Sequence, residues 1–257
     1  MKQRVISALV ALAICVPLVI IGGNIFKYGV LVIGLLALRE MLKATGYNKL
    51  PIFIKYFCYL FTALLILINK SGFYLSLYIM MLVFTSTLIL LNKDKKYNIV
   101  DCFTIIGIII LLGIGFNGLI VIRSNLMIFI YLFLVSIFTD TYAYLGGRFI
   151  GKHKLIPNIS PNKTWEGSIT GSIFGTLVAA LFYYLKVDSN ISIYLLLAMT
   201  LGLTIIGQIG DLFFSAIKRH YGIKDFSNIM PGHGGILDRL DSILFIIISY
   251  ILINNMF

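Results

Sequence analysis

Long runs of hydrophobic residues alternate with short polar segments along the whole chain. A helix needs about 20 apolar residues to cross the hydrocarbon core of a bilayer. Nine segments are long enough, and they are residues 5–22, 26–43, 51–69, 72–92, 99–122, 125–147, 165–186, 191–217 and 237–256. The pattern therefore predicts an all-α, polytopic integral membrane protein with about nine transmembrane helices.

The composition supports this interpretation and indicates one membrane domain over residues 1–257. The chain is 60% hydrophobic and 12% charged, and a soluble domain has a charged fraction of about 25%. No segment has the composition of a soluble domain or a linker. Within the domain, residues 1–122 form N-terminal hydrophobic spans, and residues 125–257 carry the polar motifs in the loops 148–164 and 218–236.

The basic residues predict how the chain is oriented in the membrane. If the N-terminus is cytoplasmic, 16 of the 21 Lys and Arg residues fall in cytoplasmic segments, four fall outside, and Lys55 lies within a span. Cytoplasmic loops of membrane proteins carry an excess of Lys and Arg. We therefore expect a multi-pass protein of the cell membrane with its N-terminus and both motif loops in the cytoplasm and its C-terminus outside.

The stretch from Gly207 to Ser242 concentrates ionisable residues that are rare elsewhere in the chain. Four of the ten acidic residues lie here: Asp211, Asp225, Asp238 and Asp241. Ionisable groups at membrane depth are costly, so they indicate a functional site by default.

Two predicted helix faces carry these charges. Asp211, Ser215 and Lys218 are spaced four and three residues apart, so they share one face of a helix. Asp238 and Asp241 are three residues apart and share a face of the next predicted helix. The two faces therefore place carboxyl groups at the facing ends of two successive helices.

The connection between these helices, residues 230–235, contains Pro231 and three glycines and cannot be helical. Its backbone N–H groups, together with Lys218 and Arg219, are groups that bind phosphate. Carboxylates bind Mg²⁺ through one or two of their oxygens. The combination suits a complex of a nucleotide with a metal ion. His233 lies in this turn and either has only a turn role or contacts the nucleotide.

Polar residues upstream add to this set. Asp140, near the end of the sixth predicted span, either pairs with a basic side chain or lines a polar cavity, and the cost of intramembrane charge favours the cavity. In the segment 160–167, either Asn162 or Thr164 is a suitable N-cap for the following helix. Capping leaves Ser160 and Lys163 unexplained, and Lys163 is a reasonable phosphate ligand.

The stretch 215–241 resembles the signature of the phosphatidate cytidylyltransferase family, also called CDP-diacylglycerol synthases. The residues in register are Ser215, Lys218, Arg219, Lys224, Asp225, Pro231, His233, Gly234, Gly235, Asp238, Arg239 and Asp241. The resemblance reaches upstream to Asp140 and to residues 160–167, whereas the first half of the chain resembles the family only in being hydrophobic.

The resemblance implies an activity and a set of site residues, with residues 125–257 as the catalytic half. CTP and phosphatidate from the bilayer would give CDP-diacylglycerol and pyrophosphate, a step of phospholipid biosynthesis. The catalytic residues would be Asp211, Ser215, Lys218, Arg219, Asp238 and Asp241. The substrate-binding residues would be Asp140, Ser160, Lys163, Lys224, Asp225, His233, Gly234, Gly235 and Arg239. Mg²⁺ would bind Asp211, Asp238 and Asp241, with a second metal ion as a further expectation. A homodimer is also compatible with the sequence.

Two other functions compete with this one. A CTP-dependent membrane lipid kinase could share the features that bind the nucleotide. A membrane transporter could use broken helices and charges at the bilayer midplane. Against the transporter, the charged motifs lie at the predicted cytoplasmic ends of the spans, and the sequence has no inverted repeat.

Overall fold

The structure, a computed structural model, describes residues 2–47, 52–68, 80–81, 99–232 and 234–254. Within these residues the chain is almost entirely helical, as predicted. The helices are α1 (Lys2–Ile21), α2 (Gly23–Ala44), α3 (Ile52–Leu67), α5 (Ile99–Ile122), α6 (Leu126–Phe149), α7 (Trp165–Lys186), α8 (Ile193–His220) and α9 (Leu237–Asn254). Two short strands, β1 (Lys154–Ile156) and β2 (Ser160–Thr164), lie between α6 and α7.

The helices of the described part follow eight of the nine predicted spans, with ends that differ by a few residues. The remaining prediction, residues 72–92, lies outside the described residues except for 80–81. Four helices of the described part, α5 to α8, are long and apolar enough to cross a membrane. These helices support the interpretation of the chain as a membrane protein, whereas the count of nine spans stays a prediction.

The chain divides into two compact units. The N-terminal unit consists of Met1–Ile120 and Phe226–Ile236, and the C-terminal unit consists of Val121–Asp225 and Leu237–Phe257. The connection before α9 thus belongs to the N-terminal unit. The sequence predicts one membrane domain with halves at residues 1–122 and 125–257, and this stays a prediction.

In the N-terminal unit, α2 packs closely against α3 and α5. A Cβ atom at Gly34 of α2 would lie 2.6 Å from Ile66 and 3.2 Å from Phe116, so only glycine fits there without a shift. Leu65 packs in the same way over Gly113 of α5. Small residues of this kind let membrane helices approach closely.

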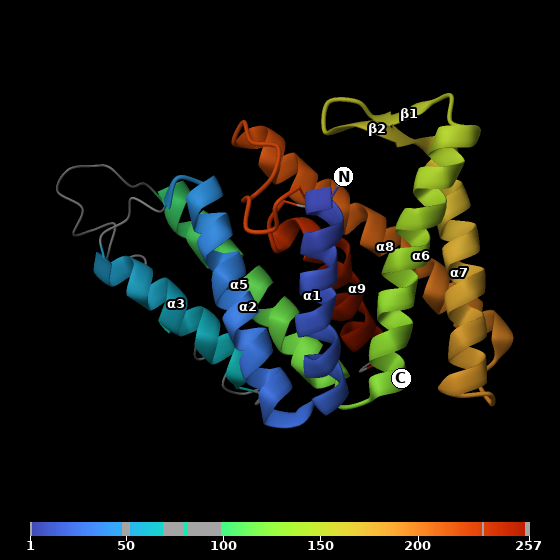
Figure 1. Cartoon of the computed structure of the whole chain (residues 1–257), viewed down its shortest axis with the longest axis horizontal. Helices are drawn as coiled ribbons and strands as arrows, with labels where there is room; N and C mark the ends of the chain where they lie inside the picture. Colours follow the sequence, from blue (N-terminus) through green and yellow to red (C-terminus); the bar gives the residue numbers. More distant parts are fainter. Residues whose placement is uncertain (1, 48–51, 69–79, 82–98, 233, 255–257) are drawn as a thin grey trace. The chain divides into compact units, whose positions relative to one another are not determined.

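In the C-terminal unit, α6 and α7 lie side by side (Figure 1), and the face of α7 toward α6 is lined by glycines. Gly167, Gly171 and Gly175 are four residues apart on this face. A Cβ atom at Gly167 would lie 2.6 Å from the Ala143 carbonyl oxygen, and one at Gly171 would lie 2.6 Å from that of Thr139. The backbones of the two helices are therefore nearly in contact.

Helix α9 packs against α8 and α6 in the same unit. A Cβ atom at Gly210 of α8 would lie 2.8 Å from the ring of Phe245 of α9. Ser136 of α6 and Ser242 of α9 share a buried hydrogen bond of 2.9 Å. These contacts hold the first half of α9 against the other helices of the unit.

The predicted loop between α6 and α7 contains a two-stranded antiparallel sheet, which the sequence analysis did not predict. Strand β2 leads directly into α7, and Thr164 caps that helix by accepting a hydrogen bond of 3.1 Å from the Gly167 N–H. Thr164 is thus the N-cap, and Asn162 is not. Glu166 closes the hairpin by accepting hydrogen bonds from the N–H groups of Lys152 and His153. The short sheet places Asn162 and Lys163 at a fixed position beside the helix start.

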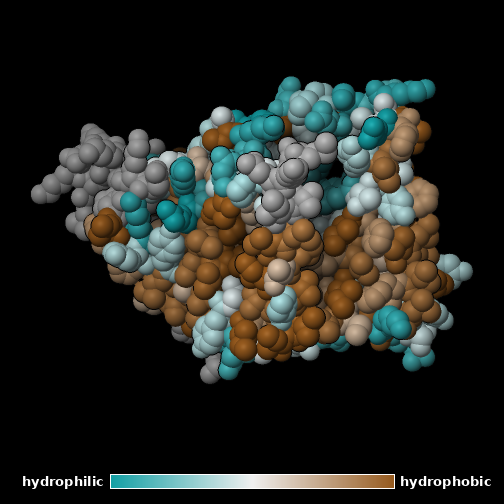
Figure 2. All heavy atoms as spheres, in the orientation of Figure 1, coloured by the Kyte–Doolittle hydropathy of each residue, from teal (hydrophilic) through white to brown (hydrophobic). Residues whose placement is uncertain are grey.

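The outer face of α7 is covered by large hydrophobic side chains. Ile173, Leu177, Leu181 and Leu185 recur every four residues, and each is about half exposed or more. Figure 2 shows hydrophobic residues over this side of the C-terminal unit and hydrophilic residues around the β1–β2 hairpin. Such an apolar surface suits lipid rather than water.

Candidate active site

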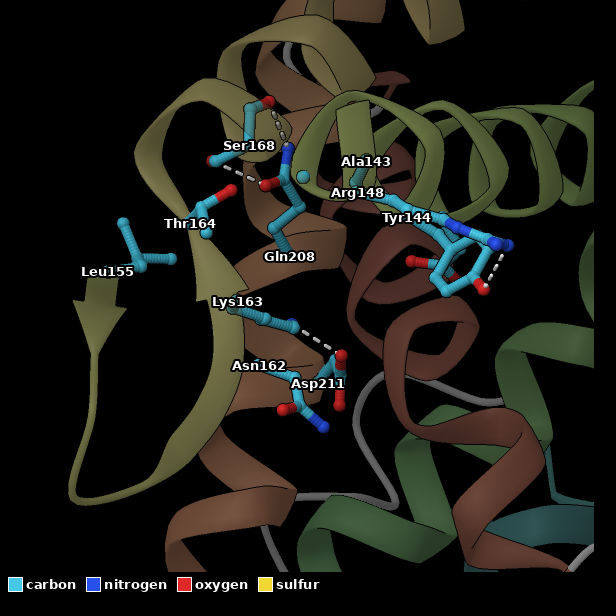
Figure 3. Close-up of a pocket in the computed structure, with 12 residues that line it drawn as sticks. Ala143, Tyr144, Arg148, Leu155, Asn162, Lys163, Thr164, Ser168, Gln208 and Asp211 are labelled. Carbon is cyan, nitrogen blue, oxygen red and sulfur yellow. Dashed lines mark hydrogen bonds and ion pairs between the residues drawn. The ribbon is translucent and has the colours of Figure 1, made fainter. Parts of the chain in front are cut away.

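A cavity of about 400 Å³ opens in the C-terminal unit, where α6, α7, α8 and the hairpin meet (Figure 3). Polar and charged side chains contribute much of its wall. They are Asp140, Tyr144, Arg148, Asn162, Lys163, Thr164, Ser168, Gln208 and Asp211. The cavity is large enough for part of a nucleotide or for a lipid head group.

Lys163 and Asp211 form an ion pair in the wall of this cavity (Figure 3). Lys163 comes from β2 and Asp211 from α8, so the fold joins two residues that are 48 positions apart. Their side chains are 29% and 25% exposed, so both are accessible from the cavity. Ser215, one turn along α8, donates a long hydrogen bond of 3.4 Å to Asp211.

A second ion pair joins Lys218 of α8 to Asp238 in the first turn of α9, with Nζ and Oδ1 2.7 Å apart. This pair is less accessible, with side chains that are 11% and 5% exposed. Desolvating two charges costs about as much as their attraction returns, so a buried ion pair is weak evidence for a role in stability. The roles of Lys218 and Asp238 in the site stay predictions.

The helices of the C-terminal unit also bring three carboxyl groups into electrostatic contact. Asp140 of α6 interacts with Asp211 of α8, and Asp241 of α9 interacts with both. Asp140 is open to the cavity, although protein surrounds its other sides. Lys163 acts on Asp140 and Lys218 acts on Asp241 in the opposite sense, so these cations partly offset the like charges of the three carboxyl groups. Asp140 lies in the wall of the cavity, and its role in substrate binding stays a prediction.

The carboxyl groups allow a test of the predicted metal site. Among the described residues, no three His, Cys, Asp or Glu side chains lie close enough together to hold one ion. Asp238, one of the three predicted ligands, is bound by Lys218. Mg²⁺, however, is usually held by one or two carboxylates together with water and substrate phosphates. Asp211, with Asp140 or Asp241, supplies such a donor set, so the residues fit Mg²⁺ and the metal stays a prediction.

The other predicted site residues occupy several places. Arg219 donates hydrogen bonds to the carbonyl oxygens of Ile159 (3.2 Å) and Ile223 (3.1 Å), which ties the end of α8 to the hairpin. Ser160 lies in β2, and Lys224, Asp225 and Arg239 are exposed residues of the C-terminal unit. Gly234 and Gly235 are buried in the N-terminal unit, and His233 lies outside the described residues.

Several polar residues of the cavity wall were not predicted as site residues, among them Gln208, Ser168 and Arg148. Gln208 accepts a hydrogen bond of 2.5 Å from the Ser168 hydroxyl and donates one of 2.8 Å to Ser172. Arg148, at the end of α6, adds a third cation to the wall and donates a hydrogen bond to Tyr144 (Figure 3). Gln208 precedes Asp211 by three residues and so shares its helix face. That spacing was the available signal.

The fold and this cavity define a class: a helical membrane protein whose charged cavity, with cations and carboxyl groups in one wall, suits phosphate-bearing substrates. A profile of the cytidylyltransferase family matches residues 2–257. The chain belongs to the cytidylyltransferase family and is a nucleotidyltransferase. The match covers the N-terminal half as well, where the sequence motifs gave no indication.

Curated relatives agree over nearly the whole chain. The chain is 38% identical over 252 residues to the phosphatidate cytidylyltransferase of Staphylococcus haemolyticus, and the alignment covers 96% of each protein. It is 38% identical over 256 residues to the protein of the same name from Staphylococcus saprophyticus, again with 96% of each covered. Identity to that of Staphylococcus aureus strain COL is 35% over 254 residues, with the same coverage.

Proposed function

We propose that the protein is a phosphatidate cytidylyltransferase, which converts CTP and phosphatidate to CDP-diacylglycerol and pyrophosphate. The observation that carries this proposal is the Lys163–Asp211 pair in the wall of a cavity that also holds Arg148 and Asp140. Cations to neutralise phosphates and carboxyl groups to hold a metal ion meet there. The family and the names of the relatives support the same activity.

The reaction needs positioning and charge neutralisation more than acid–base chemistry. A phosphate oxygen of phosphatidate attacks the α-phosphorus of CTP, the bond to the β-phosphate breaks, and pyrophosphate leaves. The attacking oxygen is already ionised near neutral pH, so no strong general base is required. Mg²⁺, when bound, would neutralise charge on the attacking and leaving oxygens.

The chain's own residues divide into two groups in this reaction. Lys163, Lys218 and Arg148 are the cations that would bind phosphate oxygens. Asp211, with Asp140 or Asp241, would hold the metal ion. Each lysine faces a carboxyl group in the structure, so a bound phosphate would take over the lysine and leave the carboxyl group for the cation.

The two substrates require the site to lie at the cytoplasmic surface of the membrane. We propose that the hairpin end of α7 faces the cytoplasm, where CTP is found, while the acyl chains of phosphatidate stay in the bilayer. A cysteine in place of Lys154, before α7, should then resist a membrane-impermeant thiol reagent in intact cells. One in place of Asn190, after α7, should react. Both positions are exposed, and Cys15, Cys58 and Cys102 would be replaced first. The opposite labelling would overturn the orientation.

The products of the reaction test the proposed activity. Purified protein with CTP labelled at the α-phosphate should transfer label to the lipid phase only when phosphatidate and a divalent cation are both present. Label in free CDP would identify a kinase instead, because a kinase moves the γ-phosphoryl group. No consumption of CTP by folded protein would contradict both enzymes and favour transport.

A further inference from the structure

A single carboxyl group in the N-terminal unit holds both ends of the connection that precedes α9. Glu40 lies near the end of α2 and is 2% exposed. Its Oε1 atom accepts a hydrogen bond of 2.5 Å from the Ser227 hydroxyl and one of 3.0 Å from the Ile236 N–H. The two donors are nine residues apart, so Glu40 joins the beginning and the end of the segment 226–236.

The backbone of this segment is shaped around the carboxyl group. A Cβ atom at Gly235 would lie 2.6 Å from each oxygen of Glu40, so only glycine admits the carboxyl group there. Phe226 and Ile236, at the two ends, are buried at 4% and 6% exposure. Within the segment, the Met230 N–H donates to the Gly234 carbonyl oxygen at 3.0 Å. The described parts of the segment, residues 226–232 and 234–236, are thus held together at Glu40.

We infer that Glu40 is a positioning residue for the reaction: it fixes the loop 226–236 and, through it, the start of α9. Leu237, the first residue of α9, directly follows Ile236, and Asp238 is the next residue. The Ile236 N–H that Glu40 anchors therefore belongs to the residue directly before the helix that carries Asp238. This inference rests on the proposed function only in that activity is one of its two readouts.

The first test measures kcat and KM for Glu40→Ala and Glu40→Gln. The glutamine carbonyl oxygen can accept the same two hydrogen bonds, so Glu40→Gln should keep about half of kcat or more. Glu40→Ala should lose about tenfold or more in kcat with little change in the KM for CTP, because the loop ends are released. Leu38→Ala is the matched control: Leu38 is buried on the same helix but has no polar side-chain atom. It should lower the melting temperature and leave kcat of the folded protein unchanged.

A double-mutant cycle with Ser227→Ala tests whether the loss of activity in Glu40→Ala comes from the hydrogen bond between Ser227 and Glu40. Residues in one hydrogen-bond network have non-additive effects. The double variant should therefore lose no more activity than Glu40→Ala alone. Losses that multiply would overturn the inference, and so would a Glu40→Ala enzyme with full kcat.

The second readout does not depend on activity. Hydrogen–deuterium exchange of peptides that cover residues 234–240 should be faster in Glu40→Ala by about tenfold, the change expected when a hydrogen bond to a carboxyl group is lost. It should be unchanged in Glu40→Gln. If the wild-type protein makes no CDP-lipid but its exchange responds in this way, the proposed function fails and the anchoring by Glu40 stands. Exchange that is identical in all variants would refute the anchoring.

Discussion

The acidic side chains of the two units have different surroundings. In the C-terminal unit, Asp211 and Asp238 each face a lysine, and Asp211 also lines a cavity. In the N-terminal unit, Glu40 is almost fully buried and meets a serine hydroxyl and a backbone N–H. A lysine at a cavity can exchange a carboxylate for a phosphate. The Ile236 N–H instead belongs to the backbone, and its hydrogen bond to Glu40 holds the chain in place. The type of partner thus distinguishes the carboxyl groups that face lysines from the carboxyl group that holds the segment 226–236.

The largest effect is expected from removing the charge of Asp238. Asp238→Asn keeps the shape of the side chain but removes the negative charge that Lys218 binds. We expect cytidylyltransferase activity to fall by about a hundredfold or more, as when a preorganised charged group is removed from an active site. Steady-state assays with α-labelled CTP measure the loss. Asp188→Asn is the control, because Asp188 is exposed in the turn between α7 and α8 and should retain full activity. Unchanged turnover of Asp238→Asn would remove Asp238 from the site.

Lys163 should contribute mainly to binding. Lys163→Ala removes a cation from the cavity, and we expect the KM for CTP or phosphatidate to rise about tenfold, since a hydrogen bond to a charged group contributes about 1.5–3 kcal/mol. Lys154→Ala is the matched control, because Lys154 is an exposed lysine of the same hairpin. Equal KM values for the two variants would show that Lys163 does not bind substrate.

The close contact of α6 and α7 should matter for stability. Gly171→Ala places a Cβ atom 2.6 Å from the Thr139 carbonyl oxygen, and overpacking of this kind costs about 1–3 kcal/mol. In contrast, a Cβ atom at Gly202 of α8 meets nothing within 4 Å. Gly202→Ala should therefore leave stability unchanged or raise it by up to about 1 kcal/mol, because alanine is the better helix former. Thermal unfolding in detergent compares the two, and equal melting temperatures would contradict the packing argument.

The smallest effect is expected at the hairpin. Glu166→Gln weakens the closure of the hairpin onto α7, where Glu166 also lies 2.6 Å from Nδ1 of the exposed His153. Exposed ion pairs contribute little, so the KM for CTP should change by about twofold. The difference from wild type should shrink in high salt, which screens surface charges. A larger effect that is insensitive to salt would mean that Glu166 contacts substrate directly.

The candidate site was predictable from the sequence where residues are close together in the chain. Asp211 and Ser215 share a helix face because a helix repeats every 3.6 residues, and the structure confirms their contact. Glu40 could also have been selected from the sequence, because it is an ionisable residue inside a predicted span and such residues indicate function. Gln208 could not be singled out from the sequence, because a polar residue three positions from an acidic one is common on any helix.

By itself, the sequence determined the helical membrane fold and the family, and it predicted a set of polar site residues. Hydrophobic length and local spacing are properties of single segments, so they can be read without knowing what each segment contacts. The tertiary structure decided the partners: Lys163 with Asp211, Lys218 with Asp238, and Glu40 with both ends of a distant loop. These partners depend on how closely the helices approach, which is set by glycines such as Gly171 and by packing between residues far apart in the chain.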